Sequence, residues 1–184
     1  MTTDQLRALG SEDVKGLATA ALAGLSAAAL GNLTSVQLGA LSSDQLQSLT
    51  STQVRGLTTA QIAALTSNQL ANIASDDLAA LSSTQLRAIE TRDLAAFDSA
   101  DLAVLTSTQL AGLTSAQLRA LDSADLPGLS TQALSGLGSA QLAGLSSVQL
   151  GALGSEQWQS MSSTQLRGLS TEQIAGLATD DLGS

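Results

Sequence analysis

Hydrophobic residues recur along this chain with a period of eight. Blocks of eight residues counted from Met1 give 23 octads, which account for all 184 residues without an insertion. Position 1 and position 6 of the octad are apolar in all 23, and Leu is by far the commonest residue at both. Position 3 is Ser or Thr in 22 octads, position 5 is Gln in 14 and Asp in six, and position 8 is mostly Gly or Ala. The repeat is therefore the whole chain.

A period of eight excludes the two simplest uniform structures. An α-helix advances about 100° per residue, so eight residues overshoot two turns by about 80° and the Leu stripe would circle a continuous helix. A β-strand needs alternation with a period of two, whereas positions 1 and 6 have opposite parity. We therefore expect each octad to form one short helix followed by a turn.

The polar positions indicate where each helix begins. Position 2 is Ser, Thr or Asp in 16 octads, and these residues are preferred at the helix N-cap. Gln at position 5 can then reach back to the N-cap amide in a capping box, while the apolar residues at positions 1 and 6 form a hydrophobic staple. In residues 105–112 these roles fall to Leu105, Thr106, Gln109 and Leu110. The Ser or Thr at position 3 could share the capping, which leaves the cap placed to within one residue.

Charged residues are sorted in the same way within the octad. All 16 acidic residues lie at positions 2, 4 or 5, and six of the seven basic residues lie at position 7, Arg92 being the exception. Acidic residues near the start of each octad and a basic residue near its end are favoured by the dipoles of many separate short helices, and one long helix would not need this sorting. The small residue at position 8, often Gly, is expected to let the backbone leave the helix and turn.

Short helices of this kind must pack on one another, because a helix of one or two turns is unstable alone. We therefore predict an all-α solenoid, a superhelix of 23 octads in which several octads make each superhelical turn and Leu lines the core. Residues 1–184 would form a single repeat domain, with positions 2, 4 and 7 facing water. Contacts would be mostly local and stability roughly additive in repeats.

The octads resemble a known kind of repeat. LTTAQIAA (57–64) and LTSTQLAG (105–112) are similar to the L-T-T-x-Q-[IL]-x-A octapeptide tracts of large bacterial proteins that are secreted, surface-located or adhesin-like. The resemblance covers all 23 octads but has no catalytic motif. It implies an extended repeat segment, part of a longer array, and an extracellular or cell-surface location.

Composition excludes most catalytic chemistry. The chain has no His and no Cys, so Ser-His-Asp and Cys-His catalysis and His- or Cys-ligated metal sites are ruled out. We expect no enzyme activity, no catalytic residue, no cofactor and no metal. Adjacent acids occur at Glu12–Asp13, Asp76–Asp77 and Asp180–Asp181. They could serve Ca²⁺ ligation or general acid–base chemistry, but acids in the first turn of a helix explain them without a ligand.

Net charge and hydropathy argue against several kinds of binding partner. The net charge of −9 argues against nucleic acid or an anionic membrane as a partner, because both are polyanions. The uncharged stretch Gly16–Ser43 follows Lys15 and could be a signal-peptide core. Its Leu residues keep the octad register and it is rich in Ala, Gly and Ser, so we favour a weakly capped part of the solenoid and expect no membrane span.

Residues that break the pattern are the remaining candidates for function. Phe97 at position 1 and Trp158 at position 6 could anchor a partner if exposed, although larger core residues are the favoured interpretation. Pro127, with Gln132 displaced in the next octad, predicts a kink or local irregularity.

Together these features favour a structural or interaction module. We expect a non-catalytic spacer, stalk or self-assembling rod of a bacterial exported or surface protein, with partners at the cell surface or, through end-to-end stacking, a second copy. One alternative is a surface-recognition module whose Ser/Thr ladder binds ice or a glycan. Another is a solenoid scaffold that binds peptides.

Overall fold

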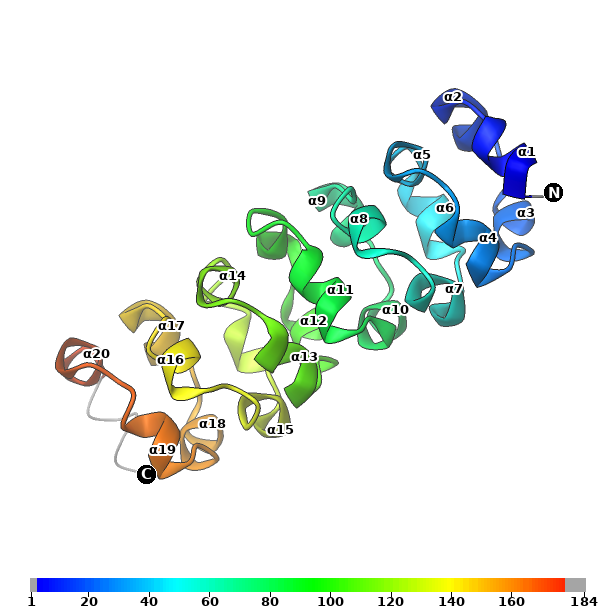
Figure 1. The fold of residues 1–184 in the computed structure, drawn as a ribbon. Coiled ribbons are helices and arrows are strands. Elements are labelled where there is room, and N and C mark those ends of the chain that lie inside the picture. Colours follow the sequence, from blue (N-terminus) through cyan, green and yellow to red (C-terminus); the bar gives the residue numbers. More distant parts are fainter. Residues whose placement is uncertain (1–2, 178–184) are drawn as a thin grey trace.

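The chain forms an elongated superhelix of short helices, with α1 and α20 at opposite ends (Figure 1). This architecture is seen in a computed structural model that describes residues 3–177. Within that range there are twenty α-helices and two 3₁₀-helices and no strand. The prediction of an all-α repeat solenoid is confirmed.

The helices lie in three columns, because nearly every helix packs on the helix three octads later in the chain. One superhelical turn therefore takes three octads. Column A contains α1 (Thr3–Ala8), α4 (Ala27–Gly31), α7 (Ser51–Arg55), α10 (Ser75–Ala80), α12 (Ser99–Ala103), η2 (Leu126–Gly128), α17 (Ser147–Gly151) and α20 (Thr171–Ala175). Column B contains α2 (Ser11–Lys15), α5 (Ser35–Gly39), α8 (Thr59–Ile62), α11 (Ser83–Ala88), α13 (Ser107–Gly112), α15 (Thr131–Leu134) and α18 (Ser155–Gln159). Column C contains α3 (Thr19–Ala23), α6 (Ser43–Gln47), α9 (Ser67–Leu70), η1 (Asp93–Ala96), α14 (Ser115–Arg119), α16 (Ser139–Leu142) and α19 (Ser163–Leu166).

The Leu staple lines the interior of the superhelix. Leu at position 6, as in Leu38, Leu70 and Leu102, is fully buried through most of the chain, and position 1 is buried from Leu33 to Leu153. Positions 2, 4 and 7 are mostly exposed, as predicted. Each octad thus buries two side chains against its neighbours, which gives the short helices the packing that they lack alone.

Each α-helix from α2 to α20 has its N-cap at position 2. In residues 105–112 the Thr106 hydroxyl accepts a hydrogen bond from the Gln109 backbone N–H (3.2 Å), and Gln109 Oε1 accepts one from the Thr106 N–H (2.8 Å). This is the predicted capping box, and it settles the N-cap at position 2 rather than position 3. Ala18 and Ala74 occupy the same position without a side-chain cap.

The expected role of glycine at the helix exit is wrong. No residue between 3 and 177 has a positive φ, and Gly56, a C-cap, has φ −79°. Glycine is instead required by a close approach between turns, because a Cβ on Gly56 would lie 2.7 Å from the Cβ of Ala27 in the preceding turn. Small residues at position 8 therefore set the spacing of the turns.

The pattern breaks keep the octads in register. The irregularity predicted at Pro127 is the 3₁₀-helix η2, and η1 is a second 3₁₀-helix, in the octad that contains Arg92. The uncharged stretch Gly16–Ser43 forms α3, α4 and α5 in the regular columns. No helix among residues 3–177 combines the length and apolarity of a membrane span.

Candidate functional site

The most regular polar feature of the solenoid is a bond between turns made by Gln at position 5. Gln61 is buried; its Oε1 accepts from the Thr58 N–H, while its Nε2 donates to the carbonyl oxygens of Leu30 and Leu33, all at 2.8 Å. These carbonyls lie 31 and 28 residues earlier, where α4 ends. One carboxamide therefore starts its own helix and ties that helix to the preceding turn. We call this arrangement the Gln clamp.

The Gln clamp recurs along the described chain. A Gln Nε2 donates to the carbonyl 28 residues earlier at Gln37, Gln45, Gln53, Gln61, Gln69, Gln85, Gln109, Gln117, Gln141, Gln149, Gln157, Gln165 and Gln173. The prediction from sequence covered only the capping half of this role. Position 5 is Gln in 14 octads and Glu in none. Because Glu would serve a capping box equally well but an ionised Glu cannot donate, that bias is the signal for the second bond.

Long side chains at position 7 make a second bond between turns, in the opposite direction. Arg55 Nε donates to the Ala80 carbonyl (3.4 Å) and Arg119 Nε to the Gly144 carbonyl (3.0 Å), in each case at the end of the helix one turn later. Gln47 makes the equivalent bond to Asn72 (2.7 Å). These donors cap free carbonyls at a helix C-terminus, where a cation is also favoured by the helix dipole.

Asp replaces Gln at position 5 in part of the solenoid. The hydrogen bond between turns then runs in the opposite direction, because the side chain at position 5 accepts it instead of donating it. The Ser51 hydroxyl of α7 donates to the Asp77 carboxylate of α10 (2.8 Å), and the Ser99 hydroxyl of α12 donates to Asp125 (2.8 Å). An ionised carboxylate accepts hydrogen bonds but cannot donate them, so these octads have no Gln clamp.

Two of these carboxylates are electrostatically unusual. Burial raises the pKa of Asp77 above its ordinary value, against the hydrogen bond from Ser51, and the Asp76 carboxylate adds to the rise. Burial likewise raises the pKa of Asp101, opposed by its bond from the Asp98 N–H and increased by the charges of Asp98 and Asp125. Both side chains are buried without a basic partner in any described ion pair.

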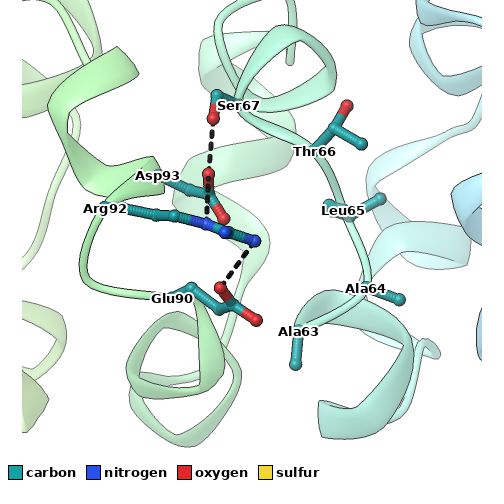
Figure 2. A pocket seen from close by; sticks show the side chains of 8 residues that line it. All are labelled: Ala63, Ala64, Leu65, Thr66, Ser67, Glu90, Arg92 and Asp93. Carbon is teal, nitrogen blue, oxygen red and sulfur yellow. Dashed lines mark hydrogen bonds and ion pairs between the residues drawn. The ribbon is translucent and has the colours of Figure 1, made fainter.

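One pocket lies where η1 meets the preceding turn. It is lined by Ala63, Ala64, Leu65, Thr66, Ser67, Glu90, Arg92 and Asp93. Figure 2 shows the Arg92 guanidinium between the two carboxylates, 2.8 Å from Glu90 and 3.6 Å from Asp93, which also accepts a bond from the Ser67 hydroxyl. A Gln at position 93 would reach the carbonyls of Ala63 and Leu65. The shorter Asp93 leaves that space open, and Arg92 is neutralised by its two acidic neighbours.

A comparison with family models identifies this pattern. The model of the ALTTAQ repeat matches residues 6–43, 40–74, 87–123 and 118–155, which together make up most of the chain. The chain belongs to the ALTTAQ repeat family. No curated protein matches it. The Gln clamp therefore belongs to an ALTTAQ-repeat solenoid, in which Gln is the last letter of the motif.

The structure shows where the residues that the sequence suggests as functional candidates lie in this ALTTAQ solenoid. Phe97 is 1% exposed and Trp158 7%, so both lie in the core, and the exposure that a partner contact required is absent. The indole N–H of Trp158 has no hydrogen-bond partner within the described chain. Glu12 pairs with Lys15 at 2.7 Å, and Asp180–Asp181 lies outside the described residues. No cluster of three potential metal ligands occurs among residues 3–177.

Proposed function

We propose that this ALTTAQ-repeat chain is a non-catalytic spacer, a rod that separates the segments joined to it in an exported or surface protein of a bacterium. The observation that carries the proposal is the Gln clamp, which repeats from α5 to α20 and fixes each turn on the one before. The length of such a rod grows in proportion to the number of octads. The bacterial surface setting rests on the resemblance of the octads to secreted and adhesin-like tracts.

Self-assembly by end-to-end stacking is the less supported version of this proposal. Stacking would continue the interface between turns, and each incoming octad would need a donor at position 5. Among the first four octads only the first carries Gln there, Gln5; the next three carry Asp13, Ala21 and Ala29, whose side chains have no amide donor. We therefore favour a spacer over a filament.

Recognition of ice or a glycan by the Ser/Thr ladder also has weaker support. The hydroxyl groups at position 2 are used within their own octads. Thr58 Oγ1, for example, accepts from the Gln61 N–H (3.2 Å) and lies 3.2 Å from Gln61 Oε1, to which it donates. A peptide-binding scaffold would need a continuous groove, whereas the described pockets are short and lie between adjacent turns.

The spacer proposal can be tested by measuring rod length. The chain has no Cys, so Val36→Cys and Val148→Cys, both at exposed positions, give two defined spin-labelling sites. Copies of residues 41–64, one complete turn with three clamps, are inserted after Ala64. Because packed helices lie about 8–10 Å apart, each inserted turn should lengthen the distance between labels by about that amount, as measured by double electron–electron resonance.

A flexible insert is the control for this measurement. Twenty-four residues of Gly/Ser linker at the same place should give a broad distribution of distances instead of a discrete increment. An unchanged or equally broad distribution for the octad insert would overturn the spacer proposal.

A further inference from the structure

Column A lacks the Gln clamp in three consecutive turns. Helices α10, α12 and η2 lie above one another in this column, and their octads carry Asp77, Asp101 and Asp125 at position 5, 24 residues apart. Gln53 in the turn before and Gln149 in the turn after are both clamped. The stretch from α7 to η2 is thus held by Ser–carboxylate bonds at Asp77 and Asp125, and at Asp101 the described bonds stay within its own octad.

The surroundings of this stretch are strongly acidic. The same octads carry Asp76, Asp98 and Asp122, all exposed. Helix α7, which packs on α10, contributes Arg55, but its guanidinium donates to the Ala80 carbonyl at the end of α10. Helices α4 and α17, at the two ends of the stretch, carry no charged residue. Repulsion between the stacked carboxylates is therefore opposed by little positive charge.

The basic residues of the neighbouring columns do not relieve this repulsion through any described ion pair. Arg87 belongs to α11 in column B, and Arg92 lies beside η1 in column C. Arg92 is paired with Glu90 and Asp93. Arg119 of α14, also in column C, donates to the Gly144 carbonyl. No described ion pair therefore joins a basic residue to Asp77, Asp101 or Asp125.

We infer that the turns of column A from α7 to η2 form a proton-operated joint: protonation of Asp77 and Asp101 tightens the contacts between turns, and deprotonation loosens them. Protonation removes a negative charge from each of two buried carboxylates, and the neutral carboxyl of Asp77 can still accept from the Ser51 hydroxyl. Loss of the proton to solvent restores a buried negative charge in a stack that already contains Asp98 and Asp125. The inference concerns the mechanics of the rod and goes beyond its proposed role as a spacer.

The sign of the pH effect follows from the direction of the pKa shifts. Burial raises the pKa of Asp77 and of Asp101 in the folded chain above the unfolded value, 3.8. The folded chain therefore binds protons at a pH where the unfolded chain does not, and stability rises as the pH falls. This contribution is complete below 3.8 and is lost as the pH rises through the raised pKa values.

The test compares thermal unfolding of the full chain with that of a variant in which the joint cannot titrate. Asp77→Gln/Asp101→Gln removes both carboxylates and supplies Gln side chains that can reach the preceding turn. Between about pH 7 and about pH 4.5 the melting temperature of the parent should rise by about 2–4 °C relative to this variant. Asp77→Asn/Asp101→Asn removes the charges without extending the side chains, and it should lose the pH response to the same extent.

A matched control removes two exposed acidic charges elsewhere. Asp44→Asn/Glu156→Gln, both at position 4 and outside column A, should keep the pH response of the parent. Equal pH dependence of the parent and both position-5 variants would overturn the inference, and so would a control that loses the response.

Hydrogen exchange, corrected for the intrinsic pH dependence, adds a local readout. Protection should increase on acidification in residues 75–128 and not in residues 35–47, and a uniform change along the chain would also overturn the inference.

Discussion

Two neighbouring parts of the solenoid have the same fold but different contacts between turns. In residues 33–72 all five octads carry a clamped Gln, from Gln37 to Gln69. In residues 73–128 four octads carry Asp at position 5 instead. The Leu staple is buried equally in both parts. Apolar positions 1 and 6 therefore determine the fold, while position 5 determines how successive turns are bonded.

The space left beside position 8 also differs along the solenoid. A Cβ on Gly56, in the octad of Gln53, would lie 2.7 Å from the Cβ of Ala27. A Cβ on Gly128, in the octad of Asp125, would lie 2.3 Å from the backbone oxygen of Ser99. The turns therefore approach more closely at Gly128, whose octad also contains Pro127 and the 3₁₀-helix η2, than at Gly56.

The largest expected effect tests whether the staple is equally important in both parts. Leu38→Ala and Leu102→Ala each remove a fully buried side chain, one from the clamped part and one from the Asp-bearing part. Each should lower the free energy of unfolding by about 2–5 kcal/mol, because a cavity remains in the core. Urea unfolding gives both values. A cost for one variant several times that for the other would show that the clamp supports the core as well.

A smaller effect isolates the donor half of the Gln clamp. Gln109→Glu keeps the acceptor for the Thr106 N–H but loses the donor to the carbonyls of Leu78 and Leu81. We expect a loss of about 1–3 kcal/mol in urea unfolding at neutral pH, since a buried charge then faces carbonyl oxygens. Gln132→Glu, at an exposed position 4, is the matched control and should be nearly neutral. Equal costs would mean that the clamp adds nothing to capping.

The spacing of the turns can be tested at position 8. Gly128→Ala should lower the free energy of unfolding by about 1–3 kcal/mol and Gly56→Ala by less, because the added methyl group meets backbone in the first case. Gly151→Ala, at position 7 and with nothing within 4 Å, should instead gain up to about 1 kcal/mol from helix propensity. A larger loss of melting temperature for Gly56→Ala than for Gly128→Ala in calorimetry would contradict the closer approach at Gly128.

The smallest effect concerns the helix caps. Thr50→Ala removes an N-cap in the clamped part and should cost about 1 kcal/mol, whereas Ala74→Ser adds a missing cap in the Asp-bearing part and should gain a similar amount. Chemical denaturation of the two single variants and the double variant would show whether the two effects add, since α7 and α10 pack on one another in column A. A destabilising Ala74→Ser would mean that α10 starts differently from the other helices.

Much of this fold can be predicted from the sequence, because its determinants lie within one octad. Thr106, Gln109, Leu105 and Leu110 contribute the cap, its partner and the two staple residues within six positions, and the acid–base sorting indicates one dipole per octad. The number of octads per superhelical turn could not be predicted in this way. Every octad offers the same apolar pair, so the apolar pattern alone cannot distinguish packing on the third octad from packing on the fourth.

The contacts between turns could be predicted only from less obvious features of the sequence. The choice of Gln over Glu at position 5 indicates a donor, and the 24-residue spacing of Asp77, Asp101 and Asp125 equals one turn. Gly at position 8 was misassigned because a helix exit and a close approach both favour a residue without a side chain, and only the negative φ separates the two. The pocket beside Arg92 could not be predicted, since it arises where a short Asp93 meets a turn 28 residues earlier.

The direction of the Gln clamp has a consequence for the order in which the rod forms. In every described clamp the amide donor comes later in the chain than the carbonyls that accept from it by 28 to 31 residues. A chain synthesised or threaded from its N-terminus thus presents each Gln to acceptors that have already emerged. No clamp has to wait for sequence that does not yet exist, so the growing end can add turn after turn to a finished template.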